Sequence, residues 1–333
     1  MVSLSMMARL LEAVRPETRL VLVGDPDQLA SVEAGAVLGD LVYRPAAASA
    51  QVPEALADLV EADLFPGELT SDRLRNGVVG LTTVHRFGHA IGELAGAIKA
   101  DHGDVVVRLL RAGGPEIEFV QADPSQAAGV LGGLREDVVT AGRALVEAAR
   151  DGDAAGALKQ LDRHRLLCAH RRGPYGVTRW ASQIERWLAG SGLTGSDEWY
   201  AGRPLLVTAN DYELQLFNGD TGVVVEQQQQ GLVAAFNRAG APVLLSPHRL
   251  SAVQTVHAMT VHRAQGSQFE RVTLVLPTGD SPLLTRELFY TAITRAREHV
   301  RVVGTEEAVR RAVSRPIVRA SGLRRAPYNA NDP

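Results

Sequence analysis

Polar residues follow a short apolar run near the start of the sequence, and their types suit phosphate chemistry. In Leu22-Val-Gly-Asp-Pro-Asp-Gln-Leu29 the apolar run leads into Asp25 and Gln28. The carboxyl end of a buried strand is where α/β proteins bind ligands, and an amide there can orient an attacking water while donating to a phosphate oxygen. Asp25 equally suits a turn, because Asp, Pro and Gly favour turns. The octapeptide alone therefore predicts either a phosphate sensor or a structural turn.

Two arginines follow other apolar stretches. Arg86 comes after the strand expected over residues 78–84, and Arg295 lies within the segment 286–297. A guanidinium keeps its positive charge at any physiological pH, which suits it to phosphate contact. In the segment 286–297 the apolar residues share one helical face, so we expect Arg295 and Arg297 to project elsewhere. Taken by itself, Arg86 is more simply an ion-paired surface residue.

Four segments in sequence order resemble the motifs of superfamily 1 helicases, and they are Leu22–Leu29, Val84–Phe87, Thr260–Phe269 and Leu288–Arg297. Together they resemble RecD-type helicases, the alpha subunit of exodeoxyribonuclease V, over nearly the whole chain. The resemblance implies nucleotide contact by Asp25, Gln28, Arg86, Gly266 and Arg295. It further implies catalytic roles for three of them: Gln28 and Arg86 would sense the γ-phosphate, and Arg295 would stabilise transition-state charge across a domain cleft.

The third of these segments resembles the helicase motif that touches the DNA backbone. The resemblance assigns Thr260 and His262 to DNA, and it assigns Gln265 and Gly266 to the coupling of DNA with nucleotide. It also implies that the Gly-Ser turn opens a helix beside the nucleotide, where free helix-terminal N–H groups suit anionic oxygens. Family members commonly have Glu in place of Gln268, so this chain lacks a carboxylate expected near the ribose.

The segment Pro204–Val224 resembles a further signature of RecD-type helicases. Asn218-Gly219 within it is a strong hairpin signal, so the simpler role of this segment is to begin a β-rich region. An exposed aromatic ring can stack on bases of any sequence, which makes Tyr212 a candidate DNA contact. For Phe217, packing in the core is the simpler expectation.

A phosphate-cradling Gly-x-x-x-x-Gly-Lys-Ser/Thr loop occurs nowhere in the sequence. The two lysines, Lys99 and Lys159, are followed by Ala and Gln, so neither can be the lysine of such a loop. The Asp197-Glu198 pair follows Gly-Ser rather than an apolar strand, which argues against a Mg²⁺-holding role. We expect no metal site within these residues. ATP and Mg²⁺ are implied for the full-length family, with their principal ligands outside this sequence.

Alternating strand and helix patterns predict an α/β fold with a largely parallel sheet. The expected strands are 19–23, 78–84, 117–121, 165–170, 204–209, 271–276 and 300–304, with a helix over 88–99. Short β-rich runs between 218 and 257 indicate a small barrel, and RecD-type helicases carry an SH3-like β-barrel at the corresponding place. The resemblance implies RecA-like P-loop NTPase helicase domains, the first of them partial.

The resemblance and the patterns together give the expected domain boundaries. They are 1–87 for the end of the first RecA-like domain with an insertion at 44–77, 88–217 and 258–315 for the second RecA-like domain, 218–257 for the SH3-like barrel insert and 316–333 for a basic tail.

The composition is that of a folded protein with room for two domains: 333 residues, 45% apolar and 22% charged. No apolar run approaches the roughly 20 residues of a membrane span, and the start lacks a basic secretory signal, so we expect a cytoplasmic protein without membrane contact. With a net charge of −3, DNA contact requires a local basic groove, for which 163–172 and 310–325 are candidates. Cys168 is the single cysteine and its neighbours are apolar, so we expect a buried thiol.

These observations predict the C-terminal portion of an ATP-dependent 5′-to-3′ DNA helicase of the RecD type. The resemblance implies single-stranded DNA or DNA ends as a partner, together with the nuclease-helicase beta subunit and the gamma subunit of exodeoxyribonuclease V. It also implies a role in double-strand-break repair and recombination. Because the P-loop is absent, we expect no ATPase activity from these residues alone. The alternative is a non-catalytic DNA-binding or subunit-docking module derived from such a helicase.

Overall fold

Residues 2–30, 37–42, 77–81, 85–125, 131–278 and 281–317 are described by the computed structural model. The chain divides into two compact units, one of Met1–His85 with Ile317–Pro333 and one of Arg86–Pro316. Most of the predicted insertion at 44–77 and of the basic tail at 316–333 lies outside the described residues. Within the described ranges, no helix is both long and apolar enough to cross a membrane.

The first unit contains two described helices, α1 (Leu4–Ala13) and α2 (Val37–Val42). Helix α1 begins after Ser3, whose hydroxyl accepts a hydrogen bond from the Met6 N–H at 3.3 Å. This side-chain cap satisfies one of the backbone donors that a helix start leaves unpaired.

The strand predicted over residues 19–23 does not form. Val21 and Val23 are 72% and 92% exposed, and the segment pairs with no strand of the described residues. An apolar run becomes a strand only where a neighbouring strand completes its hydrogen bonds, and no such neighbour is described in this unit. Residues 77–81 are likewise not a strand, and the rest of the strand predicted over 78–84 lies largely outside the described residues.

The second unit contains a five-stranded sheet with the order β1-β10-β9-β2-β8. Its strands are β1 (Ile117–Gln121), β2 (His164–Cys168), β8 (Ala258–Thr260), β9 (Phe269–Val275) and β10 (Ala296–Gly304). Every neighbouring pair is parallel, which confirms the predicted parallel sheet. Strand β8 is too short to give a periodic pattern in the sequence.

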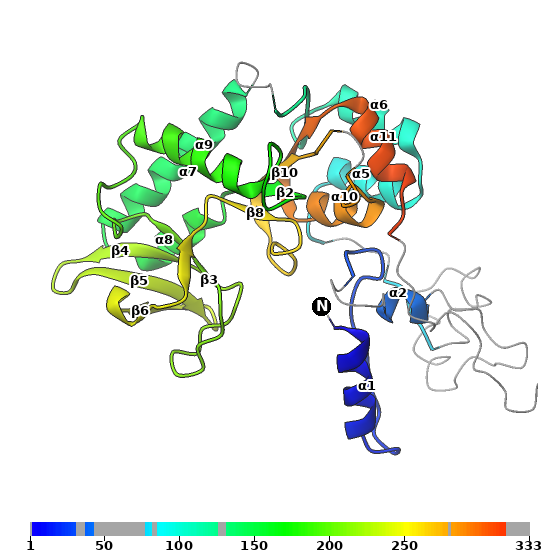
Figure 1. The fold of residues 1–333 in the computed structure, drawn as a ribbon, viewed down its shortest axis with the longest axis horizontal. Helices are drawn as coiled ribbons and strands as arrows, with labels where there is room; N and C mark the ends of the chain where they lie inside the picture. Colours follow the sequence, from blue (N-terminus) through cyan, green and yellow to red (C-terminus); the bar gives the residue numbers. More distant parts are fainter. Residues whose placement is uncertain are drawn as a thin grey trace, which may run out of the picture. The chain divides into compact units, whose positions relative to one another are not determined.

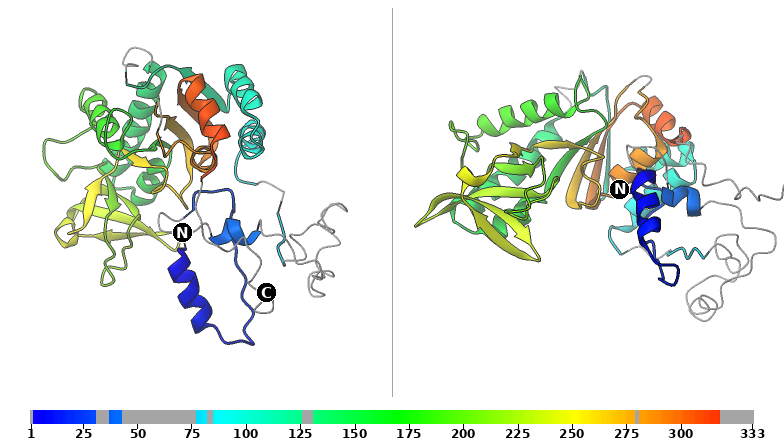
Figure 2. Two further views of the ribbon diagram at one scale, coloured as in Figure 1. Left: turned by 45° about the vertical axis from the view of Figure 1, so that its right-hand side comes forward. Right: turned by 60° about the horizontal axis from the view of Figure 1, so that its bottom comes forward.

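Helices cover both faces of the parallel sheet (Figures 1 and 2). On one face lie α7 (Gly132–Arg150) and α9 (Val177–Ala189), whose apolar residues pack against β2 and β9. On the other face lie α5 (His89–Lys99), α6 (Gly103–Ala112), α10 (Arg286–Ile293) and α11 (Glu306–Ser314). Cys168 in β2 is fully buried as predicted, and burial raises the pKa of its thiol.

A second, antiparallel sheet follows the order β6-β5-β4-β3-β7. Its strands are β3 (Pro204–Val207), β4 (Thr221–Gln227), β5 (Gly231–Arg238), β6 (Ala241–Leu245) and β7 (Val253–Thr255), with the short helix η1 (Pro247–Arg249) between the last two. The assignment of 204–209 to the parallel sheet is wrong, because β3 pairs antiparallel with β4 and β7. Among the described residues no pairing of β6 with β7 closes this sheet, so an SH3-like barrel stays a prediction.

Helix α7 serves both sheets. Leu134 and Val138 belong to the core beneath the parallel sheet, whereas Leu145 and Ala149 pack with α8 (Ala154–Leu161) against the antiparallel sheet. The two sheets of the second unit are therefore joined by a shared helix as well as by the chain itself.

Candidate functional site

The carboxyl ends of the parallel strands meet at one edge of the sheet, where α/β proteins bind ligands. Strand β8 is followed there by His262 and Arg263, and its neighbour β2 by His170 and Arg171. Arg171 is exposed and the other three are partly buried. Adjacent strands thus bring imidazole and guanidinium groups to one edge, a combination that suits the oxygens of phosphate groups.

Tyr175 joins three loops at this carboxyl edge. It lies in the loop after β2, and its hydroxyl donates to Asp123 Oδ1 at 3.2 Å, in the loop after β1. The same hydroxyl contacts Thr278 Oγ1, in the loop after β9. Desolvation raises the pKa of Asp123, but hydrogen bonds from Ser125 and Tyr175 and the charge of Arg179 outweigh it and hold that pKa below its ordinary value.

His170 adds a further link at the same edge. Its Nε2 lies 2.8 Å from Ser281 Oγ, in the segment that leads to α10. Burial lowers the pKa of His170, so this imidazole is neutral at physiological pH. A neutral imidazole offers one donor and one acceptor, which suits hydrogen bonding rather than charge neutralisation.

Thr260 ends β8 and begins a tight turn. Its Oγ1 accepts a hydrogen bond from the Arg263 N–H at 3.3 Å, and its carbonyl accepts one from the Ala264 N–H at 3.0 Å. Gly266 is exposed at φ +91°, a conformation that L side chains rarely adopt. The expected helix after the Gly-Ser turn does not form, because strand β9 begins at Phe269. That expectation is wrong, and this fully described segment offers no helix start to an anion.

Arg295 follows the end of helix α10 and is 2% exposed. Its Nε donates to Thr291 O at 3.0 Å, and its Nη1 donates to Ser267 O at 3.2 Å. The prediction that Arg295 projects away from the core is wrong, because α10 ends at Ile293 and the chain then turns into β10. Arg297 is exposed as predicted. Arg295 therefore ties the end of α10 to the turn that follows β8.

Asp25 and Gln28 form a turn in the first unit. Asp25 Oδ1 accepts from the Asp27 N–H at 3.0 Å, and Asp25 Oδ2 accepts from Gln28 Nε2 at 3.1 Å. This geometry matches the structural role that Asp favours in turns, and it fixes the orientation of the Gln28 amide. A nucleotide contact by either residue stays a prediction.

Arg86 is exposed just before helix α5. The start of that helix is already occupied by a carboxylate, since Glu116 Oε2 accepts from the Ala90 and Ile91 N–H groups at 3.0 and 3.1 Å. A side chain at Gly88 would collide with the Glu116 carboxylate, because a Cβ there lies 2.3 Å from it. An anion near Arg86 would therefore be held by the guanidinium and not by the helix.

Tyr212 lies on the connection between β3 and β4 and is 76% exposed. Phe217 packs edge-on against it, with ring centroids 6.3 Å apart, and is itself 49% exposed. The expectation that Phe217 packs in the core is therefore wrong, because the connection folds back on itself through Asp211 and Leu216 and turns both rings outward. The pair gives an aromatic surface at one end of the antiparallel sheet.

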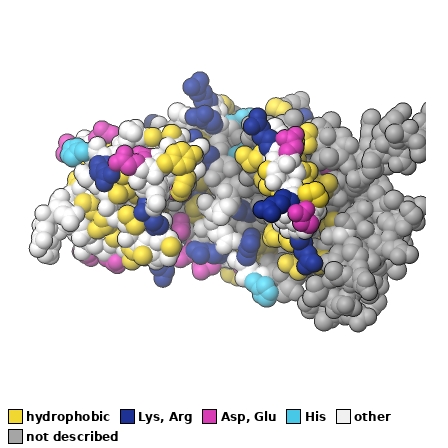
Figure 3. All heavy atoms as spheres, turned by 90° about the horizontal axis from the view of Figure 1, so that it is seen from below, with side chains coloured by type: hydrophobic (Ala, Val, Ile, Leu, Met, Phe, Trp, Pro, Cys, Tyr) yellow, Lys and Arg dark blue, Asp and Glu magenta, His cyan; other side chains and the backbone are white. Residues whose placement is uncertain are grey.

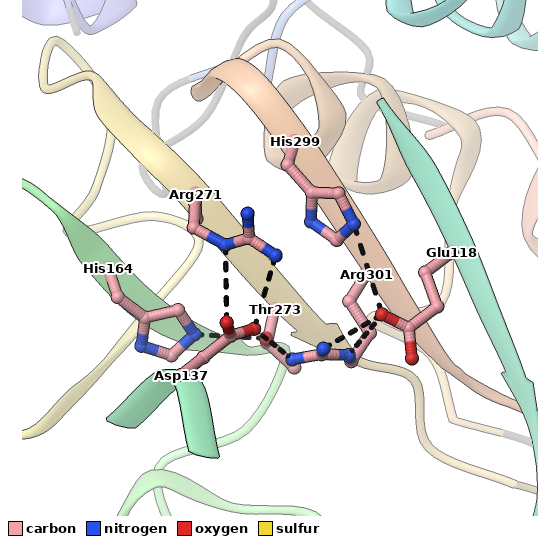
Figure 4. A network of polar contacts seen from close by, with 7 residues as sticks. All are labelled: Glu118, Asp137, His164, Arg271, Thr273, His299 and Arg301. Atoms are coloured by element: carbon pink, nitrogen blue, oxygen red, sulfur yellow. Dashed lines mark hydrogen bonds and ion pairs between the residues drawn. The ribbon is translucent and has the colours of Figure 1, made fainter. Parts of the chain in front are cut away.

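A second polar cluster lies on the amino-terminal half of the parallel sheet, under α7 (Figure 4). Arg301 is at its centre: its Nε donates to Glu118 Oε2 at 2.8 Å and its Nη1 to Asp137 Oδ2 at 2.6 Å. His164 Nε2 lies 3.0 Å from Thr273 Oγ1, and burial lowers the pKa of His164 to about 3. The cations and carboxylates of this cluster pair with one another, so the cluster is structural rather than a candidate site.

Charged side chains do not form one continuous basic surface on the face drawn in Figure 3, where Lys and Arg occur in small groups with Asp and Glu between them. The residues described by the structure also include no group of three or more His, Cys, Asp and Glu side chains able to hold a metal ion. Of the predicted site residues, the structure brings Thr260, His262, Gly266 and Arg295 into one region after β8 and α10.

The sequence is closely similar to those of RecD subunits of the RecBCD enzyme. It is 53% identical over 328 residues to the RecBCD enzyme subunit RecD of Mycolicibacterium smegmatis, covering 98% of this chain and 52% of that protein. The chain belongs to the RecD family. It is also 52% identical to the RecD subunit of Mycobacterium tuberculosis, covering 97% of this chain and 51% of that protein. The chain thus spans about half the length of these relatives.

Family models agree with this placement in RecD. A UvrD-like helicase C-terminal domain matches residues 255–303, and an AAA domain matches residues 1–56. Among solved structures, a Bacteroides Pif1 helicase in complex with ADP-AlF3 and ssDNA aligns with a TM-score of 0.37 and 12% identity, covering 74% of this chain and 55% of that chain.

Proposed function

We propose that this chain is part of an ATP-dependent 5′-to-3′ DNA helicase of the RecD type, acting in the cytoplasm in double-strand-break repair and recombination. The observation that carries the proposal is the 53% identity to a RecD subunit over 98% of the chain. That relative is named as a subunit of RecBCD, so the nuclease-helicase beta subunit and the gamma subunit of exodeoxyribonuclease V are the proposed protein partners.

Single-stranded DNA is proposed to run along the carboxyl edge of the parallel sheet. Thr260 at the end of β8, His262 after it and Arg171 after β2 would meet the phosphate backbone there. Tyr212 would stack on a base, which its 76% exposure allows. Because the chain is net negative, such binding must rest on these few positions and should be strongly dependent on salt.

Nucleotide contact is proposed for Asp25, Gln28, Arg86, Gly266 and Arg295. ATP would supply the free energy for movement along DNA. The exposed guanidinium of Arg86 and the oriented amide of Gln28 fit a role at a γ-phosphate. Arg295 donates to Ser267 O, so a change at Arg295 would reach the turn that carries the DNA contacts. Mg²⁺ is proposed to accompany ATP, as in the full-length RecD-type family.

The antiparallel sheet is the proposed counterpart of the SH3-like barrel of RecD-type helicases. Its support is the antiparallel order of five short strands, with tight turns between β4 and β5, at the polar hairpin tip 227–230, and between β5 and β6. A structure of this sheet determined with DNA bound would test both the predicted barrel and the proposed stacking of Tyr212 on a base.

The decisive test measures binding and turnover separately. We expect the full chain to bind a fluorescent oligo(dT) with an affinity that weakens as salt rises, and to hydrolyse no ATP, because it carries no P-loop lysine. Thr260→Val should weaken DNA binding several-fold relative to the exposed control change Thr140→Val on α7. Salt-independent binding, or ATP turnover that Arg295→Ala abolishes, would contradict the proposal.

A further inference from the structure

Two neighbouring aromatic rings are exposed on the connection 208–220 between β3 and β4. Tyr212 is 76% exposed and Phe217 is 49% exposed. On the same connection Leu214 and Leu216 are buried, and both pack into the core of the antiparallel sheet. The connection therefore buries its aliphatic side chains and leaves its two rings to the solvent, where they can cover a partner.

Side-chain hydrogen bonds fix the backbone that carries the rings. Asn210 Oδ1 accepts from the Asn218 N–H at 2.8 Å, and Asn210 Nδ2 donates to the Tyr212 hydroxyl at 3.3 Å. Asp220 Oδ2 accepts from the Phe217 N–H at 2.8 Å. Because the rings are held in place in the unbound chain, a partner does not have to order them, and this favours binding.

The angle between the two rings restricts what can stack on them. Their centroids are 6.3 Å apart and their planes differ by 77°. The planes in a run of stacked bases are parallel, so such a run can lie flat on one ring only. Contact with both rings requires two bases whose planes are turned away from each other, and these bases cannot stack on each other.

The residues around the rings favour a nucleobase over an apolar protein surface. The other exposed residues of the connection are small or polar, and they are Ala209, Asn210, Glu213, Gln215, Asn218 and Gly219. The centre of a protein–protein interface is more apolar than this. A base combines a flat face that stacks with edges that take hydrogen bonds, and it therefore fits rings with a polar surround.

The connection lies within reach of the proposed DNA path. The Thr208 N–H donates to Ala252 O at 2.8 Å, and Ala252 precedes Thr260 by eight residues. Even fully extended, eight residues span at most roughly 29 Å. A single strand that meets Thr260 at the carboxyl edge can therefore continue to the two rings.

We propose that Tyr212 and Phe217 bind two successive unpaired bases, one on each ring, and turn the strand between them. The proposal rests on the binding of single-stranded DNA proposed above, and it adds Phe217 as a second stacking residue. Separating two neighbouring bases costs more in an adenine run, which stacks strongly, than in a thymine run. The chain therefore prefers single strands whose bases stack weakly.

The test compares the affinities of the full chain for oligo(dT) and oligo(dA) of equal length, measured by fluorescence anisotropy. We expect oligo(dT) to bind at least about five-fold more tightly, the lower bound for the stacking of one base on an aromatic ring. Equal affinities would overturn this inference but would leave the proposed function standing. Failure of both strands to bind at low salt would overturn the proposed function, and this inference with it.

Variants at the rings separate this effect from the general resistance of adenine runs to binding. Once Tyr212→Leu or Phe217→Leu removes either ring, a stacked run can lie on the other, so the ratio of the two affinities should fall toward one in each variant. The salt dependence of binding should not change, because the phosphate contacts remain, and so the fall in the ratio cannot come from loss of the fold. Leu244→Ala, at a 39% exposed position of β6, is the control and should keep the full ratio. A ratio that persists in either single variant would overturn the proposal.

Discussion

The two ends of the parallel sheet both carry polar side chains, but these are arranged differently. At the amino-terminal half, Arg301 is 4% exposed and gives its donors to Glu118 and Asp137. At the carboxyl edge, Arg171 is exposed and His262 is partly buried. The cluster around Arg301, here called the closed cluster, can contribute only to stability. The carboxyl edge with Arg171 and His262, here called the open edge, can exchange water for a ligand. Charge and residue type are similar in the two places, so exposure and pairing are what separate a structural cluster from a candidate site.

The largest expected effect is at the closed cluster. Arg301→Met removes the cation that Glu118 and Asp137 share and leaves Asp137 paired with Arg271 alone, at 3.4 Å. Breaking a buried pair typically costs about 3–5 kcal/mol. Glu118 is 40% exposed on its side chain, which screens part of the interaction, so we expect the lower end of this range. Urea unfolding measures the loss, and Arg297→Met on the same strand is the exposed control, with a change of about 0.5 kcal/mol or less. A similar loss of unfolding free energy in both variants would show that the closed cluster stabilises the fold no more than an exposed arginine does.

Acid should weaken the same cluster by a smaller amount. The pKa of His164 is lowered from 6.5 to about 3, chiefly by burial. Below pH 6.5 the His164 ring of the unfolded chain takes up a proton that the buried ring of the folded chain does not. The contribution of His164 to the free energy of unfolding is therefore present above pH 6.5 and is lost as pH falls toward 3. Between pH 6.5 and pH 5 the free energy of unfolding should decrease by roughly 1.5 kcal/mol through this residue.

Urea unfolding at the two pH values tests this prediction. His164→Gln should reduce the acid-induced loss of unfolding free energy by that amount, because Gln does not titrate. His248→Gln at an exposed position is the matched control and should leave the loss unchanged. An identical pH dependence in the His164→Gln variant and the unaltered chain would show that burial of this ring does not control acid stability.

The smallest expected effect is at the open edge, and it concerns binding rather than stability. Arg171→Ala should weaken binding to single-stranded DNA about five-fold and reduce the dependence of affinity on salt by close to one phosphate contact. Its unfolding free energy should change by no more than about 0.5 kcal/mol. Fluorescence anisotropy at several salt concentrations measures the first effect. Arg186→Ala, at an exposed position of α9, is the control and should bind DNA normally.

The sequence allowed the strands of the parallel sheet to be predicted where an apolar run was long enough. The strand predicted over 117–121 is confirmed residue for residue as β1, and 300–304 falls within β10. The equally apolar run 19–23 does not form a strand, and 204–209 joins the other sheet. A local pattern reports that a segment can be a strand. Which strand it pairs with depends on distant parts of the chain.

The site was predicted less completely for the same reason. The segment after β8 was recognised from its residue types, and Thr260, His262 and Gly266 do share one turn region. Tyr175 was missed because its partners Asp123 and Thr278 lie 52 and 103 residues away in the sequence. The burial of Arg295 could not be foreseen from a helical pattern, because it depends on where α10 ends.

Helix α7 has residues in the cores of both sheets, with Val138 and Val146 in one and Leu145 and Ala149 in the other. At 19 residues it is about 28 Å long, taking a rise of 1.5 Å per residue. Neither sheet can lose its covering layer without disturbing this helix, and so neither can open independently of the other. In hydrogen exchange, the slowest amides of β2 and β4 should therefore share one opening free energy and behave as a single cooperative unit.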